Sequence, residues 1–176
     1  MKQKFTILFD LDGTLVDTAP DLIRAHNQVM KKFGYPTKTI GELKNAVGKG
    51  AKAMMAKANG QWKWFDEKIQ NKMSDEFLSY YGKNILNEST LMPGVKDFLN
   101  WCKKENISMA VCTNKTEHLA VDLLKKIRIY DYFEYAVNAI PPDHPHYHEI
   151  RRLLISQVND ELHDHATYNR TDRRAS

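Results

Sequence analysis

The chain has few cysteines, no long apolar run and little excess of one charge. Cys102 and Cys112 are its only cysteines, which predicts no disulfide framework and favours the reducing cytoplasm. No apolar stretch approaches the roughly 20 residues that span a membrane, and the N-terminus lacks a signal-peptide pattern. The formal charge of +4 does not by itself indicate nucleic acid. We therefore expect a soluble, cytoplasmic protein with neither membrane nor nucleic acid as its partner.

The composition is that of a soluble globular protein and argues against wholesale disorder, with 42% apolar and 27% charged residues. A chain of 176 residues accommodates one ordinary domain, or a modest core with a smaller insertion. Apolar spacing predicts helices over 17–33, 39–47, 51–58 and 62–81, so that roughly residues 16–85 are helical. It then predicts, in order, a helix over 95–103, a strand over 107–112, a helix over 117–127 and a strand over 133–137.

Two carboxylates follow the first predicted strand. The apolar and β-branched residues 5–9 end in Asp10 and Asp12, and Gly13 comes next. In an extended segment residues i and i+2 point the same way, so both carboxylates can converge at the strand's C-terminal end. Open α/β sheets place their chemistry there. One carboxylate can then attack while the other moves a proton, and together they suit a hard cation. The alternative is an ordinary turn, because Asp-Gly is a common turn signal.

Two further turns are candidate phosphate contacts. Thr113 and Asn114 follow the buried strand over 107–112, and a hydroxyl with nearby backbone N–H groups can donate to phosphoryl oxygens. The alternative is a polar turn that caps the next helix. Gly48-Lys49-Gly50 precedes a predicted helix and can also receive an anion, although spacing alone favours a plain turn between helices.

The run D-L-D-G-T-L-V-D-T from Asp10 to Thr18 resembles the first motif of the haloacid dehalogenase superfamily, and C-T-N-K from Cys112 resembles the second. The resemblance implies a Rossmann-like parallel α/β core, formed by residues 1–15 and 86–140, with a helical cap inserted over 16–85. Phosphoglycolate phosphatase-like members are the most similar, and Gly48-Lys49-Gly50 resembles a loop of their cap.

The resemblance also implies the chemistry. By position, Asp10 is the nucleophile that becomes phosphorylated and Asp12 is the general acid and base. Thr113, supported by Asn114, binds phosphate. The implied cofactor is Mg²⁺, held by the carboxylate of Asp10 and the backbone carbonyl of Asp12, and the implied partner is a small phosphorylated metabolite. The predicted function is therefore Mg²⁺-dependent hydrolysis of a phosphomonoester through an aspartyl phosphate.

The resemblance covers about residues 4–138, and the pattern then departs from the family. The family next supplies a lysine and a glycine-acid strand end, whereas the last lysine here is Lys126 and the last glycine is Gly94. We therefore expect a core that is incomplete at its C-terminus, a poorly ordered tail over 141–176 and, at best, a much weakened phosphatase. The alternative is a non-catalytic remnant that acts as a phosphate-binding or interaction module.

Overall fold

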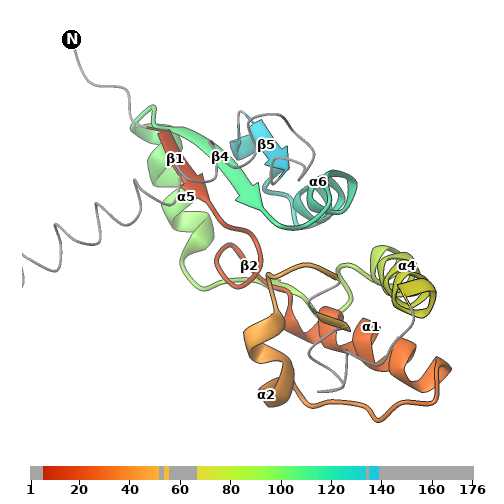
Figure 1. Ribbon diagram of the computed structural model, residues 1–176. Coiled ribbons are helices and arrows are strands. Elements are labelled where there is room, and N and C mark those ends of the chain that lie inside the picture. Colours follow the sequence, from red (N-terminus) through yellow and green to blue (C-terminus); the bar gives the residue numbers. More distant parts are fainter. Residues whose placement is uncertain (1–5, 52–53, 56–66, 134, 139–176) are drawn as a thin grey trace, which may run out of the picture. The chain divides into compact units, whose positions relative to one another are not determined.

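The computed structural model describes residues 6–51, 54–55, 67–133 and 135–138 (Figure 1). The chain divides into two units, Met1–Ala139 and Ile140–Ser176, and every described residue belongs to the first. The tail predicted over 141–176 therefore lies outside the described residues. So do the start of the helix predicted over 62–81 and most of the helix predicted over 51–58.

Three parallel strands form the main sheet. β1 (Thr6–Phe9) pairs with β4 (Ser108–Thr113), and β4 pairs with β5 (Tyr135–Asn138), so the strand order is β1-β4-β5. Helix α5 (Val95–Lys104) leads into β4, and α6 (Glu117–Lys126) with the short helix η3 (Tyr130–Tyr132) leads from β4 to β5. This arrangement confirms the predicted α/β class with a parallel sheet.

The register of the sheet brings the two predicted motifs together. Phe9 lies opposite Val111, so the residues that follow β1 meet the end of β4 at the same edge. The apolar side chain of Phe9 is buried against the rings of Phe98 and Phe133, at centroid distances of 6.1 and 5.9 Å. Burial of this anchor fixes the point at which the chain leaves the sheet.

Two short strands, one before and one after the helical insertion, pair to form a second sheet. β2 (Val16–Asp17) pairs antiparallel with β3 (Thr90–Leu91), and the insertion runs between them. The sequence did not predict these strands, because two residues are too few to show an alternating pattern.

The boundaries between the core and the cap, which the resemblance sets at 15/16 and 85/86, remain predictions. The insertion's described elements are α1 (Ala19–Lys32), α2 (Ile40–Leu43), η1 (Lys44–Ala46) and α4 (Glu67–Lys83).

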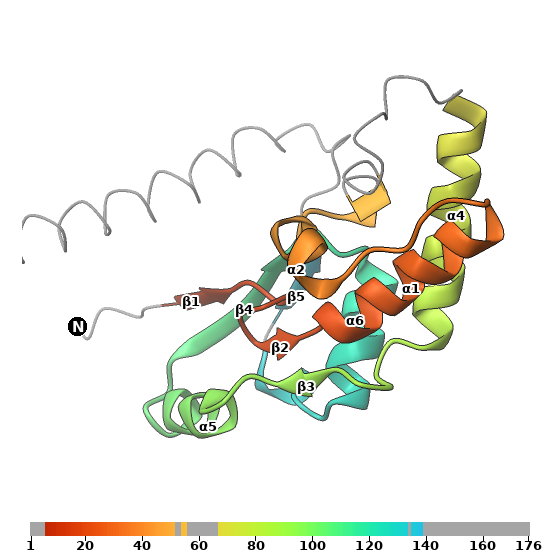
Figure 2. The same ribbon diagram turned by 90° about the horizontal axis from the view of Figure 1, so that it is seen from below.

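Helices α1 and α4 lie side by side, as Figures 1 and 2 show from two directions. Pro20 stands in the first turn of α1, and lysines in its last turn favour the helix dipole. His26 on its apolar face is completely buried, and burial lowers its pKa. On α4 the buried stripe is Met73, Phe77 and Tyr81. Apolar spacing in this segment predicts a core stripe of Phe65, Ile69, Met73, Phe77 and Tyr80. Phe65 lies outside the described residues, Met73 and Phe77 are buried as predicted, Ile69 is 40% exposed and Tyr80 is half-buried.

Asp21 ties α1 to the segment that leads back into β3. Its carboxylate is buried and accepts hydrogen bonds from the backbone N–H groups of Asn87, Glu88 and Ser89 at 2.9–3.1 Å. The hydroxyl of Ser89 donates a further bond at 2.7 Å, and Arg24 forms an ion pair with the same carboxylate. These bonds join the two ends of the insertion, more than sixty residues apart in sequence.

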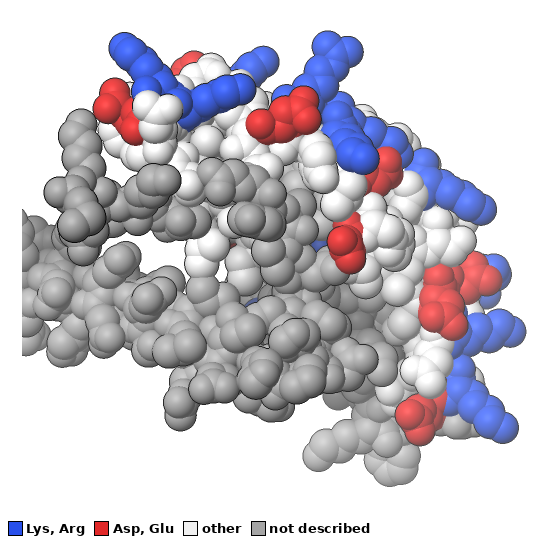
Figure 3. Space-filling view, turned by 90° about the horizontal axis from the view of Figure 1, so that it is seen from above, with Lys and Arg blue, Asp and Glu red and all other residues white. Residues whose placement is uncertain are grey.

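The described surface mixes charges of both signs. On the face shown in Figure 3, lysine and arginine side chains alternate with aspartate and glutamate along the described part. None of the described helices has the length and apolar character that crossing a bilayer requires. The large apolar side chains that are most exposed near the main sheet are Leu8 of β1 and, on α5, Phe98 and Trp101.

Candidate active site

A tight turn after β1 positions the two carboxylates. Gly13 adopts a φ of +82°, which an L side chain rarely tolerates, and its N–H donates to Val16 O at 2.8 Å. The N–H groups of Leu15 and Val16 both donate to Leu11 O. Asp10 therefore stands at the strand end on an exposed site, whereas the side chain of Asp12 is only 6% exposed.

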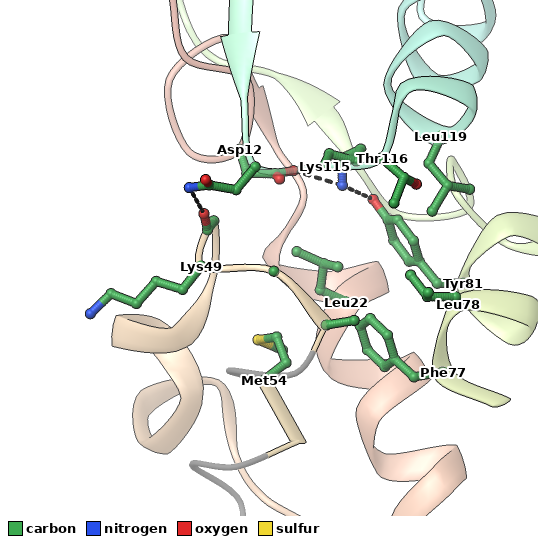
Figure 4. A pocket seen from close by; sticks show the side chains of 14 residues that line it. Asp12, Leu22, Lys49, Met54, Phe77, Leu78, Tyr81, Lys115, Thr116 and Leu119 are labelled. Atoms are coloured by element: carbon green, nitrogen blue, oxygen red, sulfur yellow. Dashed lines mark hydrogen bonds and ion pairs between the residues drawn. The ribbon is translucent and has the colours of Figure 1, made fainter. Parts of the chain in front are cut away.

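Asp12 is held by two partners on a single oxygen atom. The hydroxyl of Thr18 donates to Asp12 Oδ1 at 2.6 Å, and Lys115 Nζ lies 3.1 Å from the same atom. The Lys115 side chain is only 5% exposed, so this ion pair is buried (Figure 4). A buried carboxylate needs such a partner, because an unpaired charge away from water is costly.

Asp10 is less well compensated. Although the residue as a whole is exposed, the protein atoms around its carboxyl desolvate that group and raise its pKa, and the negative charge of Asp12 raises the pKa further. Hydrogen bonds from the Leu11 N–H and the Thr14 hydroxyl, and the charge of Lys115, oppose this effect without cancelling it. Two carboxylates close enough to disturb each other make a site that attracts a cation. Within the described ranges no third acidic, histidine or cysteine side chain completes a metal cluster with them.

Thr113 is the last residue of β4, and Asn114 follows it at the same edge of the sheet. Thr113 is buried at the end of β4, and its hydroxyl accepts a bond from the Lys115 N–H at 3.2 Å. The exposed Asn114 side chain instead donates from Nδ2 to Gly48 O at 2.9 Å. The structure thus brings Thr113 to the strand ends, as predicted, and joins Asn114 to the insertion.

The Gly48-Lys49-Gly50 loop lies against this edge. Gly48 and Gly50 have φ values of +77° and +88°. A Cβ atom on Gly48 would lie 3.6 Å from Asp12 O, and one on Gly50 would lie 3.9 Å from Asn114 O. The loop is therefore more than a turn between helices, because it packs on the residues that follow β1 and β4. The Lys49 side chain extends away from the neighbouring cavity (Figure 4).

A cavity of about 260 Å³ lies beside Asp12, between the insertion and the ends of the strands. Asp12 and Lys115 stand on one side of it, and Tyr81 of α4 extends toward Lys115 (Figure 4). Its remaining described walls are largely apolar, formed by Leu22, Ala51, Met54, Phe77, Leu78 and Leu119. The cavity can therefore receive a small molecule whose polar end lies at Asp12.

Sequence reasoning missed three residues of this site. Lys115 is the last residue of the C-T-N-K motif, and Thr18 is the last residue of the first motif. Both residues could therefore have been recognised from the motifs themselves. Tyr81 offered no signal, because an aromatic residue at helical spacing more often belongs to a core. Lys115 Nζ donates to Tyr81 Oη at 3.0 Å, which places this tyrosine in the site.

Comparison with known proteins identifies the family. The model of haloacid dehalogenase-like hydrolases matches residues 7–167. The chain belongs to this family.

The proteins that are similar in sequence include phosphoglycolate phosphatases. The one from Agrobacterium fabrum is 38% identical over 127 residues, which are 72% of this chain and 54% of that protein. The one from Nitrosococcus oceani is 32% identical over 150 residues, which are 83% of this chain and 67% of that protein. The chain thus spans about half to two thirds of the length of these haloacid dehalogenase-like relatives.

Solved structures agree on the fold. A predicted phosphoglycolate phosphatase from Haemophilus somnus superposes with a TM-score of 0.70 at 29% identity, covering 78% of this chain and 63% of that one. A predicted phosphatase from Clostridium acetobutylicum gives a TM-score of 0.71 at 22% identity, covering 90% and 72%. The second similarity concerns the fold alone.

Proposed function

We propose that this haloacid dehalogenase-like chain hydrolyses a small phosphomonoester through an aspartyl phosphate on Asp10. The observation that carries the proposal is the contrast between two neighbouring acids: Asp10 is an exposed residue whose carboxyl has a raised pKa, whereas the side chain of Asp12 is buried and its charge is compensated by Lys115 at 3.1 Å. Environments that differ so clearly suit different roles for two neighbouring acids. The family membership and the names of the relatives support the same reaction.

The proposed reaction gives each of these side chains one role. A carboxylate oxygen of Asp10 attacks phosphorus while the bond from phosphorus to the ester oxygen breaks. In its protonated form Asp12 gives a proton to the departing oxygen; the carboxylate that this leaves, with its charge compensated by Lys115, then removes a proton from the water that attacks the aspartyl phosphate. The Thr113 hydroxyl donates to a phosphoryl oxygen as negative charge develops. Asn114 acts here through its bond to Gly48, which holds the insertion against the strand ends.

The donor set fits Mg²⁺. This ion prefers oxygen ligands and keeps several waters, so one or two carboxylates with a substrate phosphate suffice. The Asp10 carboxylate and the Asp12 backbone carbonyl are the residues that would hold it. When bound, Mg²⁺ would offset negative charge on the transferring phosphoryl group.

The substrate class is inferred from the cavity and the relatives. A space of about 260 Å³ admits a small metabolite rather than a macromolecular chain. Phosphoglycolate is the natural first compound to assay, because the relatives carry that name. The cytoplasm remains the proposed compartment, in keeping with two cysteines that are not joined by a disulfide.

The test is phosphate release with Mg²⁺ from phosphoglycolate and from p-nitrophenyl phosphate. The wild-type protein is compared with Asp10→Asn and with the surface control Asp122→Asn. We expect activity in the wild type and the control, and a loss of at least about 10³-fold in Asp10→Asn, because the nucleophile is removed. Equal rates in wild type and Asp10→Asn, or no turnover in either, would refute the enzymatic proposal.

A second candidate is a non-catalytic module that pairs with another copy of the chain. One observation favours it: β1 lies at the edge of the described sheet, where Leu8 is 46% exposed. Phe98 and Trp101 on α5 are 44% and 50% exposed. Exposed sheet edges promote association. Concentration-dependent dimers in sedimentation velocity, with phosphate binding and no turnover, would support this candidate, whereas a monomer at all concentrations would contradict it.

A further inference from the structure

We propose that Lys115 and Tyr81 are positioning residues that hold the Asp12 carboxylate in one orientation, with Oδ2 directed to the reacting group. The inference rests on the proposed phosphatase function, and it assigns a role in that function to a helix of the insertion. It also identifies a buried cation in a site that the sequence predicted to lack its usual lysine.

The three side chains form a continuous buried chain of contacts. Asp12 and Lys115 have side chains that are 6% and 5% exposed, and Tyr81 is 1% exposed. Lys115 Nζ lies 3.1 Å from Asp12 Oδ1 and donates to Tyr81 Oη at 3.0 Å. The same ammonium lies 4.5 Å from the centroid of the Tyr81 ring. Lysine is almost never buried without partners, so the contacts with Asp12 and Tyr81 account for the buried position of Lys115.

The contacts select one carboxylate oxygen. Lys115 and Thr18 both bind Oδ1 of Asp12, and among the described residues no hydrogen bond or ion pair is formed with Oδ2. With Oδ1 held from two sides, rotation of the carboxylate is restricted and Oδ2 is left to exchange a proton. Much of the rate increase that a general acid gives depends on its correct placement, because small displacements of a reacting group reduce rates sharply.

Tyr81 fixes Lys115 from the other side. Burial, and then the nearby negative charge of Asp12, raise the pKa of Tyr81, so the phenol stays neutral and its oxygen can accept from the ammonium. Tyr81 lies near the end of α4, and its ring stacks on Phe77 with a centroid distance of 6.0 Å. The acid-base residue after β1 is thereby connected to the packing of the insertion (Figure 4).

The experiment compares two classes of phosphate ester in the full chain with Mg²⁺. An alkyl phosphate needs a proton on its departing oxygen, whereas nitrophenolate leaves p-nitrophenyl phosphate readily without one. The variants are Lys115→Met, Lys115→Arg and Tyr81→Phe, with Lys126→Met as the matched control. Among the residues that the structure describes, Lys126 pairs with Asp122 on the surface of α6, where both side chains are at least 40% exposed.

We expect Lys115→Met to lower kcat for the alkyl phosphate about 10²-fold, and at least about tenfold more than for p-nitrophenyl phosphate, with little change in KM. Tyr81→Phe should show the same selectivity with a smaller loss, Lys115→Arg a partial recovery, and Lys126→Met no change. An equal loss on both esters would indicate general structural damage and overturn the inference. Unchanged kcat in Lys115→Met would overturn it as well.

Thermal unfolding tests the pairing separately from turnover. Lys115→Met leaves the buried Asp12 charge unpaired and should lower Tm, and adding Asp12→Asn should restore part of the loss because it removes that charge. If wild type lacks activity on both esters but the two Tm shifts are strongly non-additive, the proposed function fails while the pairing stands. If the shifts simply add, the pairing itself is refuted.

Discussion

Replacement of Asp21 should separate the two ends of the insertion. Asp21→Ala removes the acceptor of three backbone N–H groups and of the Ser89 hydroxyl, at distances of 2.7–3.1 Å. Each buried donor left without a partner costs about 1–3 kcal/mol, although water entering the space recovers part of this. We therefore expect a loss of about 3–5 kcal/mol in the free energy of unfolding, a large fraction of the stability of a domain of this size.

The pH dependence gives this prediction a specific sign. Hydrogen bonds from Ser89 and Glu88, together with the charge of Arg24, outweigh desolvation and lower the pKa of Asp21 in the folded state. The unfolded state therefore binds the proton more readily than the folded state does. The contribution of Asp21 is fully present above its unfolded pKa of about 3.9 and is lost as the pH falls through the lower folded pKa.

Urea unfolding at pH 7 and at acid pH measures both effects. Asp21→Asn keeps the shape but not the charge, so its deficit relative to wild type should shrink as the pH falls below about 4. Asp122→Ala is the control, because its pair with Lys126 is exposed and should be worth less than about 1 kcal/mol. A loss below about 1 kcal/mol in Asp21→Ala, or a deficit in Asp21→Asn that does not change with pH, would refute the reasoning.

Two further predictions concern the loop that packs on the strand ends. Gly48→Ala should cost about 1 kcal/mol of stability because φ is +77°. A Cβ there would be in ordinary contact with Asp12 O at 3.6 Å, so a backbone shift that relieves the strained φ should also displace Asp12 and lower activity. Gly34→Ala, with φ +76° and open space, should show the stability loss alone in parallel unfolding and rate measurements. Asn114→Ala removes the bond to Gly48 O and should raise KM several-fold with a small change in Tm, and an unaltered KM in steady-state kinetics would count against a role for this contact.

Much of the fold could be predicted because it depends on strong local patterns. The helix predicted over 117–127 is observed as Glu117–Lys126, and the strand predicted over 107–112 as Ser108–Thr113. The apolar periods of these segments are set by burial against the sheet, which the sequence records directly. β2 and β3 escaped prediction because their pairing depends on residues about seventy-four positions apart and on only two residues each.

The site residues that could be predicted from the sequence are those at the ends of strands. Asp12 and Thr113 were placed by the rule that parallel strands end at one edge, and the register confirms that β1 and β4 do so. Tyr81 could not be found in this way, because its contact with Lys115 depends on how α4 packs. Asn114 was predicted as a phosphate contact, and the bond that its side chain makes to the insertion is likewise a matter of tertiary packing.

The site contains a lysine, Lys115, yet slow turnover is still expected because of where this lysine lies. Its ammonium is engaged by Asp12 Oδ1 and by Tyr81 Oη, and its effect on Asp10 is the smallest of those that act on that carboxyl. Desolvation and the charge of Asp12 still raise the pKa of Asp10. The cation therefore compensates the acid-base carboxylate rather than the nucleophile. A phosphoryl group that approaches Asp10 adds further negative charge there, so its transfer depends on positive charge from a source other than Lys115.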